Sequence, residues 1–195
     1  MDPAFQYDQY FLKRQILAFT GILRIYNPQS QLVLFCQQKL FKLREDIRIY
    51  SDEMKSRELL NVQARNVIDF SAYYDVIDSQ FTTKIGGLRR KGFRSLVQDE
   101  WEVFDPQERL IGILKEDTVN QALLRRLVLG RFLPQNYDLL LGEDRAAEYR
   151  QRRKLISYEL DIDFRMDETH VLDHRLGMAA AVLLAIIEGR QQREG

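Results

Sequence analysis

The chain of 195 residues has few of the residue types from which catalytic and metal sites are commonly built. It holds one cysteine, Cys36, and two histidines, His170 and His174. A single cysteine excludes a disulfide framework and leaves no cysteine pair for a structural zinc site. The charges also cancel, because Lys and Arg number 29, Asp and Glu number 29, and the formal net charge is zero. We therefore expect no nucleic-acid partner, since such a binder neutralises phosphates with a basic surface.

Glycine and proline are scarce as well, at 10 and 4 residues, whereas hydrophobic residues make up 45% of the chain. This composition excludes a disordered or collagen-like protein and predicts one soluble domain over residues 1–195. The N-terminal residues are acidic rather than basic, so that no signal peptide is expected. The most hydrophobic segment, residues 176–187, is shorter than the about 20 residues that a transmembrane helix needs. We expect a cytoplasmic protein without a transmembrane segment, whose contact with a membrane would be peripheral.

A short apolar pattern followed by a turn residue recurs along the chain. Its copies are centred on Ile25, Ile49, Val76, Val103 and Leu139, at intervals of 24, 27, 27 and 36 residues. After each copy come Asn, Asp, Ser, Pro or Gly, which tight turns favour, and then a second strand-like run. The repeat therefore predicts five successive β-hairpins.

Two further strands flank these hairpins, at residues 5–13 and 158–166. In the second of them, apolar residues alternate with charged ones from Glu159 to Arg165. A period of two indicates a strand with one face buried and one face in water. The total is about twelve strands, and the longer fourth interval is explained by an inserted segment, residues 117–130, which we interpret as a short surface helix.

The C-terminal segment, residues 173–189, is predicted to be a helix that is apolar all the way round. A helix without a polar face has to be surrounded by protein or lipid. About twelve antiparallel strands that close around this helix would bury it and would leave no exposed sheet edge. The small residues Ala179, Ala180, Ala181 and Ala185 would let the barrel wall approach closely. The predicted fold is therefore mainly β: a closed antiparallel β-barrel around a hydrophobic C-terminal helix.

The repeated hairpins, the basic run after the third copy and the terminal sequence DHRLGMAAAVLLAIIEG resemble the tubby-like superfamily. Within it, the chain is most similar to the LURP-one-related branch, over about residues 5–190. The resemblance implies a twelve-stranded barrel wrapped around the C-terminal helix. That superfamily includes tubby domains, which bind phosphoinositide headgroups, and phospholipid scramblases, for which an acidic calcium site before the terminal helix has been proposed. The resemblance thus implies a lipid-related role but assigns no activity.

Basic residues cluster in two places, and we predict both clusters as parts of an anionic-ligand site. The first cluster follows the third hairpin and the second lies in the fifth; they comprise Arg89, Arg90 and Lys91, and Arg150, Arg152, Arg153 and Lys154. Arginine binds phosphate with paired hydrogen bonds and lysine binds it as a mobile point charge. In an up-and-down meander, the basic ends of the hairpins would share one rim and the aspartates of the turns would share the other. The first group comprises Lys39, Arg65, Lys91, Lys115 and Lys154, and the second Asp52, Asp78, Asp105 and Asp144. The alternative is a solvated rim of mixed charge, because carboxylates lie in the same junctions.

Metal binding and catalysis both lack a sequence pattern that supports them. Asp161 and Asp163 point to the same side of a strand and could reach one cation, but the spacing of a calcium loop is absent. His170 and His174 are four residues apart, and Asp173 or Glu168 could be a further ligand, but no distant histidine or cysteine pair completes a metal shell, so that we expect the histidines to cap the helix start or to be exposed. Cys36 lies in an apolar strand, where cysteine behaves as a small buried hydrophobe. We expect no metal and no cofactor.

No nucleophile elbow, phosphate-binding loop or dinucleotide motif occurs in the sequence. A barrel filled by its own helix also leaves no lumen for a substrate, and we therefore do not expect an enzyme. Two functions remain open. The first is recognition of an anionic phospholipid headgroup or a phosphorylated ligand through exterior Arg and Lys. The second is a protein-interaction scaffold that uses residues 117–133, where Leu127, Leu129, Phe132 and Leu133 would form an apolar patch. A scramblase-like or calcium-dependent role ranks last, because the helix would have to leave the barrel.

Overall fold

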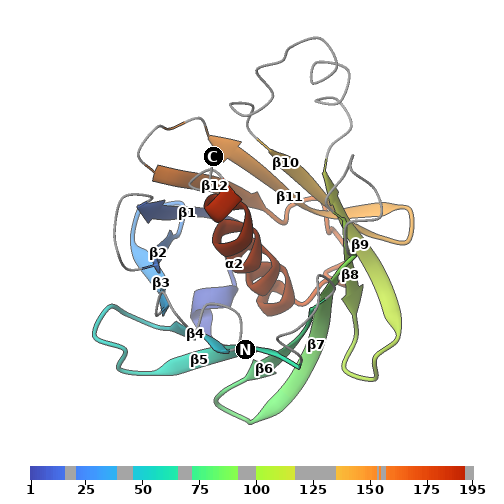
Figure 1. The fold of residues 1–195 in the computed structure, drawn as a ribbon, viewed down its shortest axis with the longest axis horizontal. Coiled ribbons are helices and arrows are strands. Elements are labelled where there is room, and N and C mark those ends of the chain that lie inside the picture. The colour runs from blue at the N-terminus through green and yellow to red at the C-terminus, as the bar shows by residue number, and fades with distance from the viewer. Residues whose placement is uncertain are drawn as a thin grey trace.

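The structure is a computed structural model that describes residues 1–15, 21–38, 46–65, 72–91, 100–116, 135–152, 154 and 157–191. In this part of the chain, 12 strands form a closed barrel around one α-helix (Figure 1). The barrel order is β1-β12-β11-β10-β9-β8-β7-β6-β5-β4-β3-β2, so that each strand pairs with its neighbours in sequence and β1 pairs with β12. The predicted fold, a closed antiparallel barrel with a C-terminal helix, is confirmed.

The chain begins with a 3-10 turn, η1 (Pro3–Phe5), and then enters the strands. The strands are β1 (Gln9–Gln15), β2 (Gly21–Tyr26), β3 (Leu32–Gln38), β4 (Asp46–Tyr50), β5 (Glu58–Ala64), β6 (Tyr73–Asp78), β7 (Thr83–Arg90), β8 (Glu100–Phe104), β9 (Leu110–Glu116), β10 (Asn136–Leu141), β11 (Asp144–Arg152) and β12 (Ser157–Asp163). The helix is α2 (His174–Gln191). The predicted insertion helix, residues 117–130, lies outside the described residues.

The five predicted hairpins are confirmed as β2–β3, β4–β5, β6–β7, β8–β9 and β10–β11. The first flanking strand differs from its prediction, because it starts at Gln9 rather than at residue 5. The reason is local: Pro3 begins the 3-10 turn, and the Asp2 carboxylate caps this turn by accepting a hydrogen bond of 2.9 Å from the amide of Ala4. The last strand, β12, ends at Asp163 rather than at residue 166.

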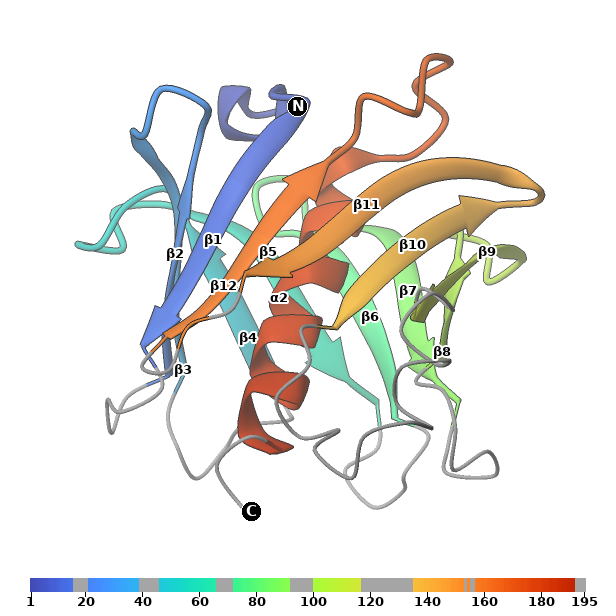
Figure 2. The same cartoon turned by 90° about the horizontal axis from the view of Figure 1, so that it is seen from above.

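Because all neighbouring strands are antiparallel, the barrel has two distinct ends (Figure 2). We call the end with the hairpin turns, residues 27–31, 51–57, 79–82, 105–109 and 142–143, the turn rim. We call the opposite end, where the odd-numbered strands finish, the loop rim. This meander places Arg65, Lys91, Lys115 and Lys154 at the loop rim, and Asp52, Asp78, Asp105 and Asp144 at the turn rim. Lys39, which was predicted to join the first group, lies outside the described residues.

Helix α2 starts at the turn rim and runs through the barrel toward the loop rim (Figure 2). Every side chain from Met178 to Ile186 is at most 3% exposed, as expected for a helix without a polar face. Burial of each large aliphatic side chain stabilises the fold by about 1.5–3 kcal/mol. Among the described residues, no helix is both long and apolar enough to cross a membrane.

Two glycines allow the start of α2 to lie close to the barrel wall. A Cβ atom added at Gly177 would lie 2.6 Å from Cε1 of Phe164, which is closer than van der Waals contact. A Cβ atom added at Gly86 on β7 would lie 2.9 Å from Cδ2 of Leu176 and 2.6 Å from the carbonyl oxygen of Phe104. Side chains at these positions would therefore push the helix away from the wall.

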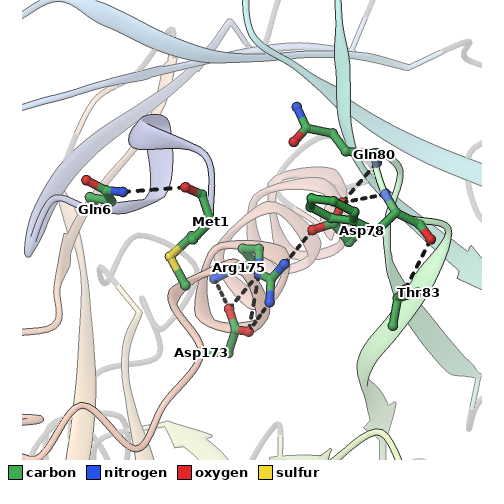
Figure 3. Close-up of polar contacts among 8 residues, drawn as sticks. Met1, Gln6, Asp78, Gln80, Thr83, Asp173 and Arg175 are labelled. Atoms are coloured by element: carbon green, nitrogen blue, oxygen red, sulfur yellow. Dashed lines mark hydrogen bonds and ion pairs between the residues drawn. The ribbon is translucent and has the colours of Figure 1, made fainter.

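The turn-rim end of α2 is held by polar contacts from three parts of the chain. Asp173 caps the helix by accepting a hydrogen bond of 2.9 Å from the amide of Arg175. The Arg175 guanidinium lies between the carboxylates of Asp173 and Asp78, and so connects the helix to the end of β6 (Figure 3). Nδ1 of His174 lies 3.2 Å from the carbonyl oxygen of Phe5, next to the N-terminal turn. The helix is thus attached to both the N-terminal segment and the barrel wall.

A buried arginine near the other end of α2 was not predicted from the sequence. The side chain of Arg14 on β1 points inward, and its Nη1 donates a hydrogen bond of 2.6 Å to the carbonyl of Ala185. A backbone carbonyl oxygen can accept a second hydrogen bond, and a charged donor makes that bond stronger. Arg14 therefore links the first strand of the barrel to the last turns of the helix.

Candidate ligand-binding groove

A groove of about 740 Å³ lies on the outer face of β11, β12, β1 and β2. It extends to the turn between β2 and β3, where Asn27, Pro28 and Ser30 line it. Six charged side chains also line it, of which three are positive and three negative: Lys13, Arg150, Arg152, Glu148, Asp161 and Asp163. The strands that form the groove come from the two ends of the sequence, and the pairing of β1 with β12 brings them together.

The pleat of the strands decides which residues face the groove. On β1, Tyr10 and Leu12 are buried in the barrel, and the alternate residues Phe11 and Lys13 therefore face outward. Phe11 is paired with Asp161 on β12 and with Tyr26 on β2. The rings of Phe11 and Tyr26 are stacked, with centroids 6.2 Å apart and planes at 29°. Two aromatic side chains thus line the groove next to the charged residues of β11 and β12.

Arg152 is the residue that connects the aromatic and charged parts of the groove. Its Nε and Nη2 donate hydrogen bonds of 2.7 and 2.6 Å to the two carboxylate oxygens of Asp161. Its guanidinium carbon lies 4.6 Å from the centroid of the Phe11 ring, which is a cation–π contact. The hydrogen bonds to Asp161 raise the pKa of Arg152, so that the group stays charged. The side chain is nevertheless 52% exposed.

Arg150 is held more tightly than Arg152. Its Nη2 lies 2.8 Å from Oδ1 of Asp138 and 3.0 Å from Oε1 of Glu148. Its Nη1 also donates a hydrogen bond of 3.3 Å to the carbonyl oxygen of Tyr137. Two carboxylates therefore neutralise Arg150. The residue forms part of the groove wall and has little capacity left to bind a ligand.

Lys13 has the loosest ion pair among the three cations of the groove. Its Nζ lies 3.6 Å from Oε1 of Glu159, which is longer than a hydrogen bond. Glu159 is itself buried and accepts a hydrogen bond of 2.9 Å from the hydroxyl of Ser157. Because the ammonium group has three donors, this arrangement leaves donors of Lys13 for a ligand.

Asp163 closes the turn-rim side of the groove. Its carboxylate accepts hydrogen bonds from Nε2 of Gln9, at 2.9 Å, and from the guanidinium of Arg165. Burial raises the pKa of Asp163, but the hydrogen bonds from Arg165 and Gln9 together with the charge of Arg165 outweigh burial and lower the pKa below its ordinary value. Asp161 and Asp163 face the same side of β12, as predicted, but each of them is paired with an arginine.

The first predicted cluster, at the end of β7, lies elsewhere on the barrel, because β8, β9 and β10 separate β7 from β11. Arg89 is paired with Glu102 at 2.6 Å, and its guanidinium carbon lies 5.1 Å from the centroid of the Phe104 ring. Lys91 is paired with Glu100 and lies 3.8 Å from Glu102. Arg90 also has an interaction partner, so that none of these three basic residues is unpaired. The two clusters therefore do not form one site.

The two remaining predicted residues of the second basic cluster are Arg153 and Lys154. Arg153 lies outside the described residues, whereas Lys154 is exposed just after β11. Sequence reasoning missed Lys13, Phe11 and Tyr26 as lining residues of the groove. The alternation of Tyr10 and Leu12 with Phe11 and Lys13 would have identified the outward-facing pair, but not its neighbours.

His174, His170 and Cys36 are the residues considered above for metal binding or catalysis. The ring of His174 is stacked on Phe164 with centroids 4.4 Å apart, and His170 lies exposed in a turn with a φ of 51°. Within the described ranges, no group of three or more His, Cys, Asp and Glu side chains could hold a metal ion. Cys36 is buried, as predicted, and burial raises the pKa of its thiol to about 12. A thiol with this pKa is not ionised near neutral pH and is a poor nucleophile.

A family model for LURP-one-related proteins matches residues 32–185, from the first residue of β3 into α2. The chain belongs to the LURP-one-related family. A search of the curated proteins found no match. The resemblance inferred from the hairpins and the terminal helix is therefore confirmed. In this LURP-one-related protein, the family match includes β11 and β12 of the groove, whereas β1 and β2 precede it.

Proposed function

We propose that this LURP-one-related protein is a non-catalytic binding module and that the groove on β11, β12, β1 and β2 binds a phosphate-bearing ligand. The observation that supports this proposal is the position of Arg152. It belongs to a basic cluster that the sequence singles out, it lines a groove, and it is half exposed there. An anionic phospholipid headgroup and a soluble phosphorylated compound both carry the required group.

Lys13 and Arg152 are the residues that would hold the phosphate. Both are paired in register with Glu159, from opposite sides of β12. Adjacent strands are about 4.8 Å apart, so that two long side chains on either side of one strand reach the same phosphate. Asp161 engages Nε and Nη2 of Arg152, and the N–H groups of Nη1 remain for the ligand. Charge-assisted hydrogen bonds of this kind are the strong ones in proteins.

The proposal that the protein is not an enzyme rests on the filled interior of the barrel and on the surroundings of the reactive side chains. Helix α2 fills the barrel, Cys36 is buried with a raised pKa, and His174 contacts the carbonyl of Phe5. We also propose a cytoplasmic protein that contacts membranes peripherally. The scaffold alternative would use residues 117–133, which lie outside the described residues, so that no observation favours it.

The proposal is tested by sedimentation with phospholipid vesicles, made from zwitterionic lipid alone or with anionic lipid or a phosphoinositide, with and without calcium. Arg152→Ala should reduce binding by about 10- to 150-fold, because a charged hydrogen bond contributes about 1.5–3 kcal/mol. Arg89→Ala is the matched control, since Arg89 also lies over a phenylalanine ring and pairs with a carboxylate outside the groove. Equal losses for the two variants, or no binding to any vesicle or soluble phosphate compound, would contradict the proposal.

A further inference from the structure

We infer that the groove selects a zwitterionic phosphate compound, in which an ammonium group accompanies the phosphate, over a ligand with several negative charges. Phosphoethanolamine and phosphocholine groups have this chemistry. The inference rests on the proposed function of the groove and names the class of its ligand. It is supported by the balance of charge in the groove and by the position of the two aromatic rings.

The charges that line the groove are equal in number, with three cations and three carboxylates. The charged groups that pair with lining residues from outside the groove do not change this balance, because Glu159 and Asp138 are negative whereas Arg165 and Arg145 are positive. Sites that attract polyanions need an excess of positive potential. A ligand with several negative charges would therefore meet Glu148, Asp161 and Asp163 as well as the cations. A ligand without net charge avoids this repulsion.

The two ends of a zwitterion find different partners in the groove. Lys13 and Arg152 provide donors for the phosphate, as described above. Lys13 follows Phe11 by two residues, which is about 7 Å along a strand, and Phe11 is paired with Tyr26. The Tyr26 ring therefore lies within reach of an ammonium group attached to a phosphate on Lys13. The faces of aromatic rings attract such cations.

One of the two rings, that of Phe11, already contacts a cation of the protein, which supports the inference that this part of the groove suits positive charge. Arg152 lies over Phe11, and Phe11 is stacked on Tyr26. The carboxylate of Asp161, paired in register with Phe11, offsets the positive charge of Arg152, so that this pair adds no net positive charge beside the rings. The volume of about 740 Å³ is within the range of about 300–1,000 Å³ that is typical of small-molecule sites. A free compound and a lipid headgroup both fit this size.

The test is a calorimetric titration of the full chain with glycerophosphocholine, glycerophosphoethanolamine, inorganic phosphate and inositol trisphosphate. The two zwitterions should bind at least about 10-fold more tightly than either anion. Tyr26→Leu should weaken binding of the zwitterions by about 10-fold and leave that of inorganic phosphate unchanged. Tyr50→Leu is the matched control, because Tyr50 is also a half-buried strand tyrosine with a cation, Lys55, near its ring. Circular dichroism verifies that both variants are folded.

The possible outcomes separate the inference from the proposed function. Tighter, Arg152-dependent binding of inositol trisphosphate would support the phosphate site and overturn the preference for zwitterions. Unchanged zwitterion binding in Tyr26→Leu would overturn it as well. If no phosphate compound binds, the proposed function itself fails. Tyr26-dependent binding to phosphatidylcholine vesicles supports the inference with a lipid as the source, and binding of the free compounds alone supports it with a soluble source.

Discussion

The outer face of β11, β12 and β1 and the outer face of β7 and β8 are built from the same contacts. On the first, Arg152 lies over Phe11 and pairs with Asp161. On the second, Arg89 lies over the ring of Phe104 and pairs with Glu102. The first face contains the groove, with Phe11 half buried, whereas Phe104 on the second face is only 7% exposed.

The difference comes from the neighbouring strand. On β7, Gly87 has no side chain, and the ring of Tyr73 occupies the space, since a Cβ atom at Gly87 would lie 2.1 Å from Oη of Tyr73. The Tyr73 and Phe104 rings are 5.3 Å apart, and Arg65 and Lys84 lie over the Tyr73 ring. On both faces an arginine lies over an aromatic ring, and the neighbouring side chains decide whether a groove remains beside it.

The largest expected effect is unfolding of the whole barrel, which removes the groove face and the face of β7 and β8 together. Ala181→Asp places a carboxylate in the centre of α2, where Ala181 is fully buried, and an unpaired buried charge costs several kcal/mol. We expect insoluble or unfolded protein, as measured by solubility and far-ultraviolet circular dichroism. Met54→Asp introduces the same group at a turn residue, since Met54 is 89% exposed, and should leave the fold unchanged. A soluble Ala181→Asp variant of normal stability would show that α2 does not have to lie inside the barrel.

A smaller effect is expected where Tyr73 covers β7. Gly87→Val should lower the free energy of unfolding by about 1–3 kcal/mol, because the new side chain occupies the space of the Tyr73 ring. Urea denaturation measures this change. In a Tyr73→Ala background the same substitution should cost less, since the competing ring is gone. If the cost is the same in both backgrounds, the contact between Tyr73 and Gly87 does not distinguish the two faces.

The next prediction compares the two arginines directly. Arg152→Ala and Arg89→Ala should each lower the free energy of unfolding by less than about 1 kcal/mol, because exposed ion pairs contribute little. Their effects on stability should therefore be similar, as measured by urea denaturation. Only Arg152→Ala should also weaken ligand binding. A loss of stability for Arg152→Ala alone would indicate that its role is structural.

The smallest effect concerns acid stability near the Tyr73 ring. Hydrogen bonds from Arg65, and then from Lys84, lower the pKa of Glu108 from 4.5 to about 2. Because the folded state has the lower pKa, the ionised group stabilises the fold above pH 4.5, and this contribution is lost as the pH falls toward 2. Glu108→Gln should flatten the pH dependence of unfolding between these values and leave ligand binding unchanged. An unaltered pH profile would mean that other carboxylates dominate the acid response.

Much of the fold could be predicted from local patterns. Turn residues at regular intervals predicted the hairpins, because adjacent antiparallel strands need only a short connection. The absence of a polar face predicted that α2 is buried, because such a helix is not stable in water. The starting point of β1 could not be predicted from alternation alone, since the Asp2 cap and Pro3 favour a 3-10 turn there.

The candidate site was predicted only in part. Arg150 and Arg152 were identified as basic residues of one hairpin, but Arg89 and Lys91 were expected to join them and lie on another face. Lys13 and Tyr26 were missed, because a local pattern shows which side of its strand a residue faces but not which residues lie beside it.

By itself, the sequence determined the strands, their turns and the burial of the helix, since these depend on residues that are close along the chain. The tertiary structure decided the groove. Closure pairs Gln9 with Asp163 and Lys13 with Glu159, residues about 150 positions apart. A shift of one residue in this register would turn Phe11 and Lys13 inward, and no local signal specifies the partner of β1. The groove exists because the barrel closes in this register.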